Sequence, residues 1–240
     1  MKRTELPVTK AYKGLGMEGP IARWYARTTA CYRAEFEALA GRIAQDLMPG
    51  ASVLEIAPGP GYLAVELAKR GFQVTGVDIS RAFVEVATEN AARAGVAADF
   101  RRGDAAALPF ADSAFDFLVC RAAFKNFANP AGALSEMHRT LRANSKALII
   151  DMRRDASDAA ISETVGEMRL GPASRFFTML IFKHMLRKRA YTRESFLRMI
   201  AASPFGHGQI DESPMGFDIW LEKPGAAALS APMTQMTATC

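Results

Sequence analysis

Two glycines and two acids near predicted strand ends are the residues of this 240-residue sequence best suited to hold a cofactor. Gly59 and Gly61 stand in a Gly-x-Gly-x-x-Ala pattern between a strand and a helix, where the backbone can approach a ligand and the helix offers free N–H groups. This pattern alone admits NAD or FAD, with Asp78 as the acid for a ribose hydroxyl. Glu55, just before the turn, would repel a pyrophosphate, so it favours a ligand that carries an ammonium or sulfonium group.

A third acid, Asp104, follows the next predicted strand. Its carboxylate can accept a hydrogen bond from the exocyclic amine of an adenine. A fourth strand opens at Phe115, and the segment after it ends at Asn129-Pro130, where another helix begins. Because the carboxyl ends of parallel strands share one edge of a sheet, where α/β proteins bind ligands, these acids predict a cleft for a cationic nucleoside.

An alternation of strands and helices positions these residues. Strands are predicted at residues 52–56, 73–78, 98–101, 115–120 and 147–151. Strands separated by helices pair in parallel through crossovers, and two weaker strands at 209–211 and 217–222 can complete the sheet as a hairpin. The sequence therefore predicts an α/β fold with a doubly wound, mostly parallel seven-stranded sheet and helices on both faces.

The segments around this core have different patterns. Residues 1–50 are interpreted as an N-terminal helical cap, with helix over 21–48 interrupted near Thr28, and residues 51–223 as the main domain. Residues 152–190 are interpreted as a helical insert or lid. Residues 224–240 carry no charge and are rich in Ala, Ser, Thr and Met, which predicts a disordered tail.

The motifs, in this order, resemble those of the class I S-adenosylmethionine-dependent methyltransferases of the small-molecule type. The resemblance covers residues 52–151, and its motifs lie at residues 53–61, 74–80, 103–110, 115–130 and 133–150. It implies a Rossmann-like methyltransferase fold and S-adenosyl-L-methionine as cofactor, released as S-adenosyl-L-homocysteine.

The resemblance also implies roles at the methionine end of that cofactor. Glu55 would engage the methionine ammonium, and the backbone of Ala57, Gly59 and Gly61 would lie against the methionine and ribose parts. Arg121, at the end of the fourth strand, would lie near the methionine end, and an ordinary salt bridge is the alternative for this residue.

At the adenosine end, the resemblance implies that Asp78 takes the ribose hydroxyls and that Ile79 packs on the adenine. Asp104 and the N–H of Ala105 would read the adenine edge.

The catalytic residues depart from the family pattern. Where many relatives carry paired histidines after the fourth strand, this chain has Lys125 and Asn126, which we expect to orient or polarise the acceptor, with loop hydrogen bonding as the alternative. His184, in an aromatic helix, could reach a substrate pocket.

Methyl transfer is an in-line displacement with a neutral leaving group, so alignment and exclusion of water are the main tasks of the enzyme. Where relatives read Pro-Gly-Gly, this chain has Asn144, which tolerates a left-handed φ.

Aromatic residues predict the acceptor. Trp24, Tyr25, Tyr32 and the 176–185 helix would build its pocket in this resemblance, which suits a small apolar or aromatic molecule, and core packing is the alternative. Residues 183–198 hold six basic residues and one acid, a local cluster that disfavours nucleic acid as substrate. No metal site is predicted.

Other functions and the cellular setting stay open as alternatives. A catalytically idle S-adenosylmethionine-binding protein, a nicotinamide oxidoreductase, and a methyltransferase that acts on a lipid or quinone at a membrane surface through the 175–189 helix all fit part of the pattern. The sequence has neither an apolar run long enough for a bilayer span nor an N-terminal apolar region, and its three cysteines lack CxxC spacing. These features predict a reduced, cytoplasmic protein, and the sequence leaves the oligomeric state open, with a homo-oligomer among the alternatives.

Overall fold

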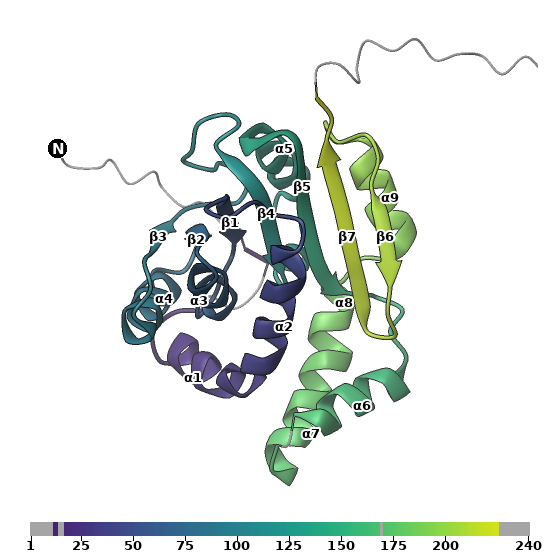
Figure 1. Cartoon of the computed structure of the whole chain (residues 1–240). Helices are drawn as coiled ribbons and strands as arrows, with labels where there is room; N and C mark the ends of the chain where they lie inside the picture. Colours follow the sequence, from purple (N-terminus) through teal and green to yellow (C-terminus); the bar gives the residue numbers. More distant parts are fainter. Residues whose placement is uncertain (1–11, 14–16, 169, 226–240) are drawn as a thin grey trace, which may run out of the picture.

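One seven-stranded sheet organises the computed structural model, which describes residues 12–13, 17–168 and 170–225. Its spatial order is β3-β2-β1-β4-β5-β7-β6 (Figure 1). Strands β1 to β5 pair in parallel, and β7 pairs antiparallel with both β5 and β6. The strands are β1 (Ser52–Ile56), β2 (Gln73–Asp78), β3 (Ala98–Arg102), β4 (Phe115–Arg121), β5 (Leu141–Met152), β6 (Gln209–Glu212) and β7 (Gly216–Lys223). The predicted doubly wound, mostly parallel sheet is confirmed.

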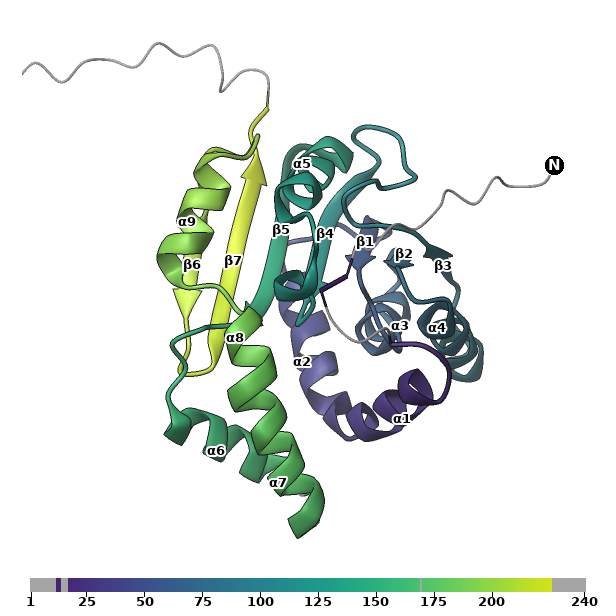
Figure 2. The same ribbon diagram turned by 180° about the vertical axis from the view of Figure 1, so that it is seen from behind.

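Helices cover both faces of this sheet (Figures 1 and 2). On one face α2 and α3 pack with Val53, Phe117 and Leu148, and on the other face α5 and α9 pack with Leu54, Leu118 and Ile149. Alternate residues of the central strands thus enter two separate cores, as buried parallel strands require. The helical elements are α1 (Gly19–Thr29), η1 (Ala30–Tyr32), α2 (Arg33–Ala44), α3 (Tyr62–Lys69), α4 (Arg81–Ala94), η2 (Phe124–Asn126), α5 (Pro130–Thr140), α6 (Asp158–Glu167), α7 (Pro172–Leu180), η3 (Ile181–Leu186), α8 (Arg187–Arg189) and α9 (Arg193–Ala201).

Local signals in the sequence set the helix ends. Ser80 accepts the N–H of Phe83 at the start of α4, and Gly95 ends that helix in a left-handed conformation with φ +69°. Asn129 accepts the N–H of Gly132 at the start of α5. These caps fix where each helix begins relative to the strand end before it, and therefore where the intervening loops lie.

Strand β5 is longer than predicted, because it begins at Leu141 instead of residue 147. Its pairing with β4 shifts register between Phe115 and Phe117, and Asn144 has φ +60°. The left-handed φ expected of Asn144 is confirmed, but it lies within the strand rather than before it. The irregularity lets pairing resume toward the carboxyl end of β5.

The N-terminal helices and the insert both lie at the carboxyl end of the parallel strands (Figures 1 and 2). The hydroxyls of Thr28 and Thr29 donate to the carbonyls of Trp24 and Tyr25, and the chain tightens into the 3-10 turn η1 directly afterwards. In the insert, α7, the π-helical η3 and α8 run on from one another and pack against α6. Most of the predicted tail, residues 226–240, lies outside the described residues.

Among the described residues, none of the helices is long and apolar enough to cross a membrane. Cys31 and Cys120 are free thiols, the first exposed and the second buried, while Cys240 lies outside the described residues.

Candidate cofactor and substrate site

Charged side chains end four neighbouring parallel strands at one edge of the sheet. Glu55 lies near the end of β1, Asp78 ends β2, Arg121 ends β4, and Asp151 lies at the end of β5. Three of these, the carboxylates, are buried. Since a buried charge is costly unless it is paired, the partners of each group show what it does in the protein.

Glu55 is 4% exposed, and its Oε2 atom has no hydrogen-bond partner among the described residues. Burial raises the pKa of Glu55 to about 8, while the backbone of Ala64 and the charge of Arg121 lower it by less. An unpartnered, buried carboxylate oxygen is destabilising unless a donor arrives. A ligand ammonium would supply that donor, so the site fits the cofactor that the sequence motifs imply.

Asp78 joins the glycine turn to the start of α4. Its Oδ2 accepts the N–H of Gly59 at 3.0 Å, and its Oδ1 accepts the N–H of Ser80 at 2.8 Å. Burial raises the pKa of Asp78 to about 6, against the smaller lowering by these N–H groups. The carboxylate therefore holds the turn in shape. A role at a ribose stays a prediction.

The two glycines of the turn differ in what surrounds them. Gly59 has φ +53°, and a Cβ built on it would meet no atom within 4 Å. A Cβ on Gly61, with φ +75°, would lie 2.8 Å from the Cβ of Ala87 and 3.1 Å from the ring of Phe100. Gly61 therefore permits close packing of α3 on α4 and β3, and the contact of its backbone with the ligand stays a prediction. Ala57 also has a positive φ, +56°, at the strand-to-turn junction.

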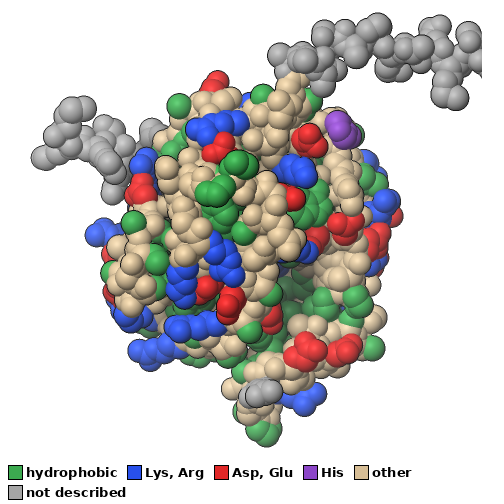
Figure 3. Space-filling view, in the orientation of Figure 1, with side chains coloured by type: hydrophobic (Ala, Val, Ile, Leu, Met, Phe, Trp, Pro, Cys, Tyr) green, Lys and Arg blue, Asp and Glu red, His purple; other side chains and the backbone are tan. Residues whose placement is uncertain are grey.

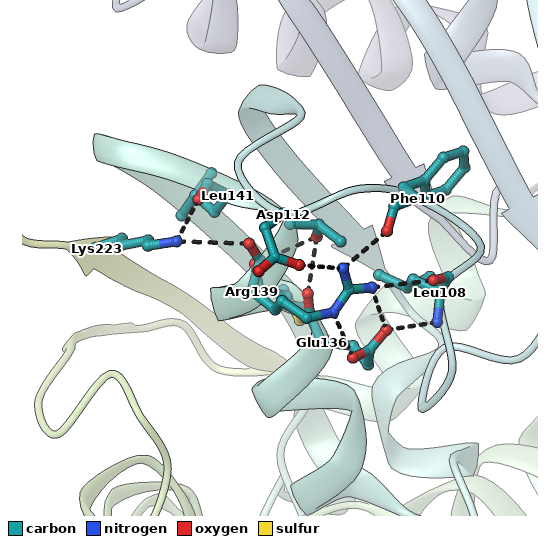
Figure 4. A network of polar contacts seen from close by, with 9 residues as sticks. Leu108, Phe110, Asp112, Glu136, Arg139, Leu141 and Lys223 are labelled. Atoms are coloured by element: carbon teal, nitrogen blue, oxygen red, sulfur yellow. Dashed lines mark hydrogen bonds and ion pairs between the residues drawn. The ribbon is translucent and has the colours of Figure 1, made fainter.

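A hydrogen-bond network around Arg139 of α5 stabilises residues 103–110, the loop predicted to contact the adenine (Figure 4). Asp104 is half-buried, and its Oδ1 accepts the N–H of Ala106, which fixes a tight turn and leaves Ala105 half-buried at its tip. Further along, Arg139 of α5 donates to the carbonyls of Leu108 and Phe110 and pairs with Asp112. In the same network, Glu136 accepts the N–H of Leu108. Ile79, the predicted adenine contact, is half-buried after β2.

Arg121 forms a salt bridge with Glu35 of α2 at 3.1 Å, and its guanidinium lies 4.7 Å from the ring centroid of Phe36. This is the salt-bridge alternative considered for Arg121. The contact ties the N-terminal helices to the end of β4, close enough to Glu55 for the charge of Arg121 to act on it.

Lys125 and Asn126 are both buried, in the turn η2. The Nζ of Lys125 lies 2.7 Å from Asp151 Oδ1 and also donates to the carbonyl of Ala122, and its own backbone N–H donates to Asp151 Oδ2. Lys125 therefore has a structural ion pair, and its ammonium is not directed at an acceptor as expected. Asn126 differs, because its Oδ1 is buried without a partner among the described residues.

Sequence reasoning missed Asp151 as the partner of Lys125. The signal was present, since Asp151 ends a predicted strand in the same way as Asp78. It also missed Tyr12 and Lys13, which contact the turn η2: Tyr12 forms a backbone bridge with Phe127, and the Lys13 N–H donates to the Asn126 carbonyl at 2.8 Å.

The structure does not bring His184 into this cluster. Its side chain is exposed on η3 of the insert. The aromatic residues expected to line an acceptor pocket also face solvent in part, since Trp24 is 62% and Phe176 is 61% exposed. A catalytic role for His184 therefore has no support from the geometry.

Known proteins agree with this arrangement. A family model described as "Methyltransferase domain" matches residues 54–149. The uncharacterized methyltransferase YcgJ of Bacillus subtilis is 28% identical over 183 residues, covering 73% of this chain and 66% of that protein. The demethylmenaquinone methyltransferase of Deinococcus radiodurans is 34% identical over 107 residues, 44% of either chain. A solved structure from Methanococcus maripaludis, described as an S-adenosyl-L-methionine-dependent methyltransferase, has a TM-score of 0.70 at 21% identity, covering 88% of this chain and 96% of that chain.

The strand order defines a Rossmann-like fold, and its acid-bearing edge lies at the carboxyl ends of the parallel strands, where α/β proteins bind ligands. Residues 54–149 match a methyltransferase domain, and most of the chain is similar in fold to a solved S-adenosylmethionine-dependent methyltransferase. The matches span 66% and 44% of the lengths of the two curated relatives, less than two thirds of each.

Proposed function

We propose that this protein transfers a methyl group from S-adenosyl-L-methionine to a small apolar or aromatic molecule. The observation that carries the proposal is the buried Oε2 of Glu55, which lacks a donor at the edge where the sheet binds ligands. A nicotinamide dinucleotide would bring a pyrophosphate to this carboxylate, which like charges disfavour. The methionine ammonium would instead satisfy it.

In this proposal the residues of the chain bind and orient. Glu55 accepts the ammonium, Gly59 leaves room for the ligand beside the turn, and Asp78 accepts the ribose hydroxyls while it keeps its two backbone donors. Asp104 and Ala105 contact the adenine edge. When bound, the sulfonium supplies an activated methyl group with a neutral leaving group, so no residue is required to protonate that group.

Fewer residues of the candidate site point to the methyl acceptor than to the cofactor. Asn126, whose Oδ1 is buried without a partner among the described residues, is the residue that we expect to orient it, while Lys125 holds η2 in place through Asp151. The Deinococcus relative is named for a demethylmenaquinone, which supports an acceptor of the quinone type here. An in-line displacement requires the acceptor to be aligned and water to be excluded, and apolar surroundings serve both needs.

Calorimetric titration of the Asp78→Ala variant with S-adenosylmethionine tests the cofactor assignment. We expect binding to weaken by more than about tenfold, because charge-assisted hydrogen bonds to the ribose are lost. Asp116→Ala is the matched control. Asp116 also accepts a backbone N–H, from Ser52, but lies at the opposite edge of the sheet, where β4 begins. Equal affinity in the two variants would remove Asp78 from the site.

A turnover assay distinguishes the enzyme from a catalytically idle binder. Wild-type protein is supplied with S-adenosylmethionine and a panel of hydroxylated and demethylated quinones, and S-adenosylhomocysteine is quantified by mass spectrometry. The proposal predicts product with at least one quinone and a loss of turnover in Asn126→Leu at unchanged cofactor affinity. Tight cofactor binding without product from any quinone would contradict the proposed acceptor class.

A further inference from the structure

Four large apolar side chains are exposed on one side of the α7–η3 rod. Phe176 is 61%, Phe177 63%, Leu180 39% and Ile181 39% exposed. Phe176 and Leu180 are four residues apart, and so are Phe177 and Ile181, which places all four side chains on one face of the helix. The other face is already filled, because Met179, Phe182 and Leu186 pack on α6. The exposed face therefore has no partner among the described residues, although it holds two aromatic rings.

A second apolar face is exposed on α1. Ile21 is 48%, Trp24 62% and Tyr25 36% exposed, while Ala22 and Ala26 are buried on the opposite side of the helix. Figures 1 and 2 show that α1 and α7 both project from the end of the molecule at which the parallel strands terminate. In Figure 3 hydrophobic side chains reach the surface at this same lower end, where α7 lies in Figure 1.

The charges around these two faces are mainly positive. Helix α1 carries no acid and two arginines, of which Arg23 pairs with Glu89 of α4, and no acid occurs in residues 171–193. The whole insert, residues 152–190, has eight basic and four acidic residues, of which Asp158 is bound by Lys183 and Arg187. The remaining acids of α6, Glu163 and Glu167, are exposed on the neighbouring helix.

Cations and aromatic rings follow one another along the rod. Arg175, which is exposed, directly precedes the two phenylalanines, and Lys188 is exposed in α8, which follows the rod. Exposed aromatic rings flanked by cations match the boundary of a bilayer, where rings enter beside the acyl chains and cations contact the phosphates.

We infer that α1 and the α7–η3 rod dock this protein on an anionic lipid surface, with the cofactor edge of the sheet turned toward the bilayer. A second copy of the chain is a poorer occupant, because its cations would meet those of the first copy. The docking deepens the proposed function: if methyl transfer to an apolar acceptor is correct, that acceptor is delivered from lipid.

Flotation with vesicles tests the docking with the full chain and without cofactor or turnover, so the result does not depend on the methyl-transfer proposal. The vesicles are either phosphatidylcholine alone or phosphatidylcholine mixed with phosphatidylglycerol. We expect flotation with the mixed vesicles and much less with phosphatidylcholine alone. Phe176→Ser/Phe177→Ser should reduce the bound fraction by roughly tenfold or more, because the favourable free energy of transferring each aromatic ring from water into the bilayer is lost. Trp24→Ser should reduce it in the same direction.

The matched control is Met48→Ser. Met48 is 79% exposed, more than any residue of the two faces, but it precedes β1 at the opposite edge of the sheet. Its flotation should equal that of wild type. Flotation that is absent, or equal in wild type and the double phenylalanine variant, would overturn the inference. So would a concentration-dependent dimer in sedimentation that the phenylalanine variant abolishes without any vesicle binding, because the face would then belong to a second copy.

Discussion

Glu55 and Asp151 are two buried carboxylates on the same edge of the sheet, separated by strand β4. They differ in the hydrogen-bond donors that the protein supplies to them. Asp151 receives donors from the Lys125 ammonium, the Lys125 N–H and the Met152 N–H. Glu55 keeps an oxygen without any donor among the described residues. Because both are buried, the difference cannot come from solvent.

The contrast separates structural residues from candidate ligand residues more clearly than residue type does. A buried acid whose donors all come from the chain holds the backbone together, as Asp151 holds the turn η2. A buried carboxylate that lacks a donor is stable only if it remains protonated or if a ligand supplies a hydrogen-bond donor. The same contrast holds for the glycines, where Gly61 is closely surrounded and Gly59 has open space.

Lys125→Ala is expected to have the largest effect on stability. It leaves Asp151 buried without its counter-charge, and breaking such a pair costs about 3–5 kcal/mol of unfolding free energy. The matched control is Lys69→Ala. Lys69 is also 2.7 Å from its carboxylate, on Glu66, but the lysine side chain is 47% exposed instead of 5%. There we expect less than about 1 kcal/mol.

Urea denaturation followed by circular dichroism measures both losses. If Lys125→Ala is no less stable than Lys69→Ala, the ion pair does not hold η2, and Lys125 returns as a candidate to contact the acceptor. A double variant, Lys125→Met/Asp151→Asn, should recover much of the loss, since no unpaired charge then remains.

Gly61→Ala and Gly59→Ala should separate packing from binding. The new Cβ at Gly61 would collide with Ala87 in a strained, positive-φ conformation, so we expect a loss of about 2–4 kcal/mol. Gly59→Ala carries only the strain, about 1–2 kcal/mol, but its methyl group would occupy the open space of the turn. Its affinity for S-adenosylmethionine should fall by roughly tenfold, as measured by titration calorimetry. Unchanged affinity in Gly59→Ala would place the ligand elsewhere.

Much of the fold follows from short-range signals that the sequence displays. Strands β1 and β2 have the predicted bounds, because turn residues limit each of them, and the caps at Ser80 and Asn129 depend on neighbours within three residues. The start of β5 was not predicted, since residues 141–146 become a strand only through pairing with β4 and β7.

The sequence indicated which residues make up the candidate site but not how they pair with one another. Glu55 and Asp78 were recognisable from their places at strand ends. The partnership of Lys125 with Asp151 depends on the adjacency of β4 and β5, which brings together residues 26 apart in the sequence. The crowding at Gly61 depends on α4 and β3 in the same way. The outward position of His184 depends on which side of its helix packs on α6, and both sides were apolar in sequence.

The last prediction concerns the pH dependence that Glu55 itself confers. Its pKa is about 8 in the folded protein and 4.5 as the ordinary value, so the folded state retains a proton that the unfolded state releases between these values. Stability is therefore fully present below pH 4.5 and declines as the pH rises toward 8, by at most about 1.4 kcal/mol per pH unit.

Asp78, with a pKa raised from 3.8 to about 6, acts in the same direction over a lower range. Glu55→Gln, which cannot ionise, should therefore flatten the decline between pH 6 and 8 and leave the Asp78 contribution below it. Thermal unfolding of both proteins across this range measures the difference. Added S-adenosylmethionine should stabilise wild type more than Glu55→Gln, because a bound ammonium favours the ionised carboxylate over its protonated form. Parallel pH profiles for the two proteins would mean that Glu55 already has a donor, and the contrast with Asp151 would fail.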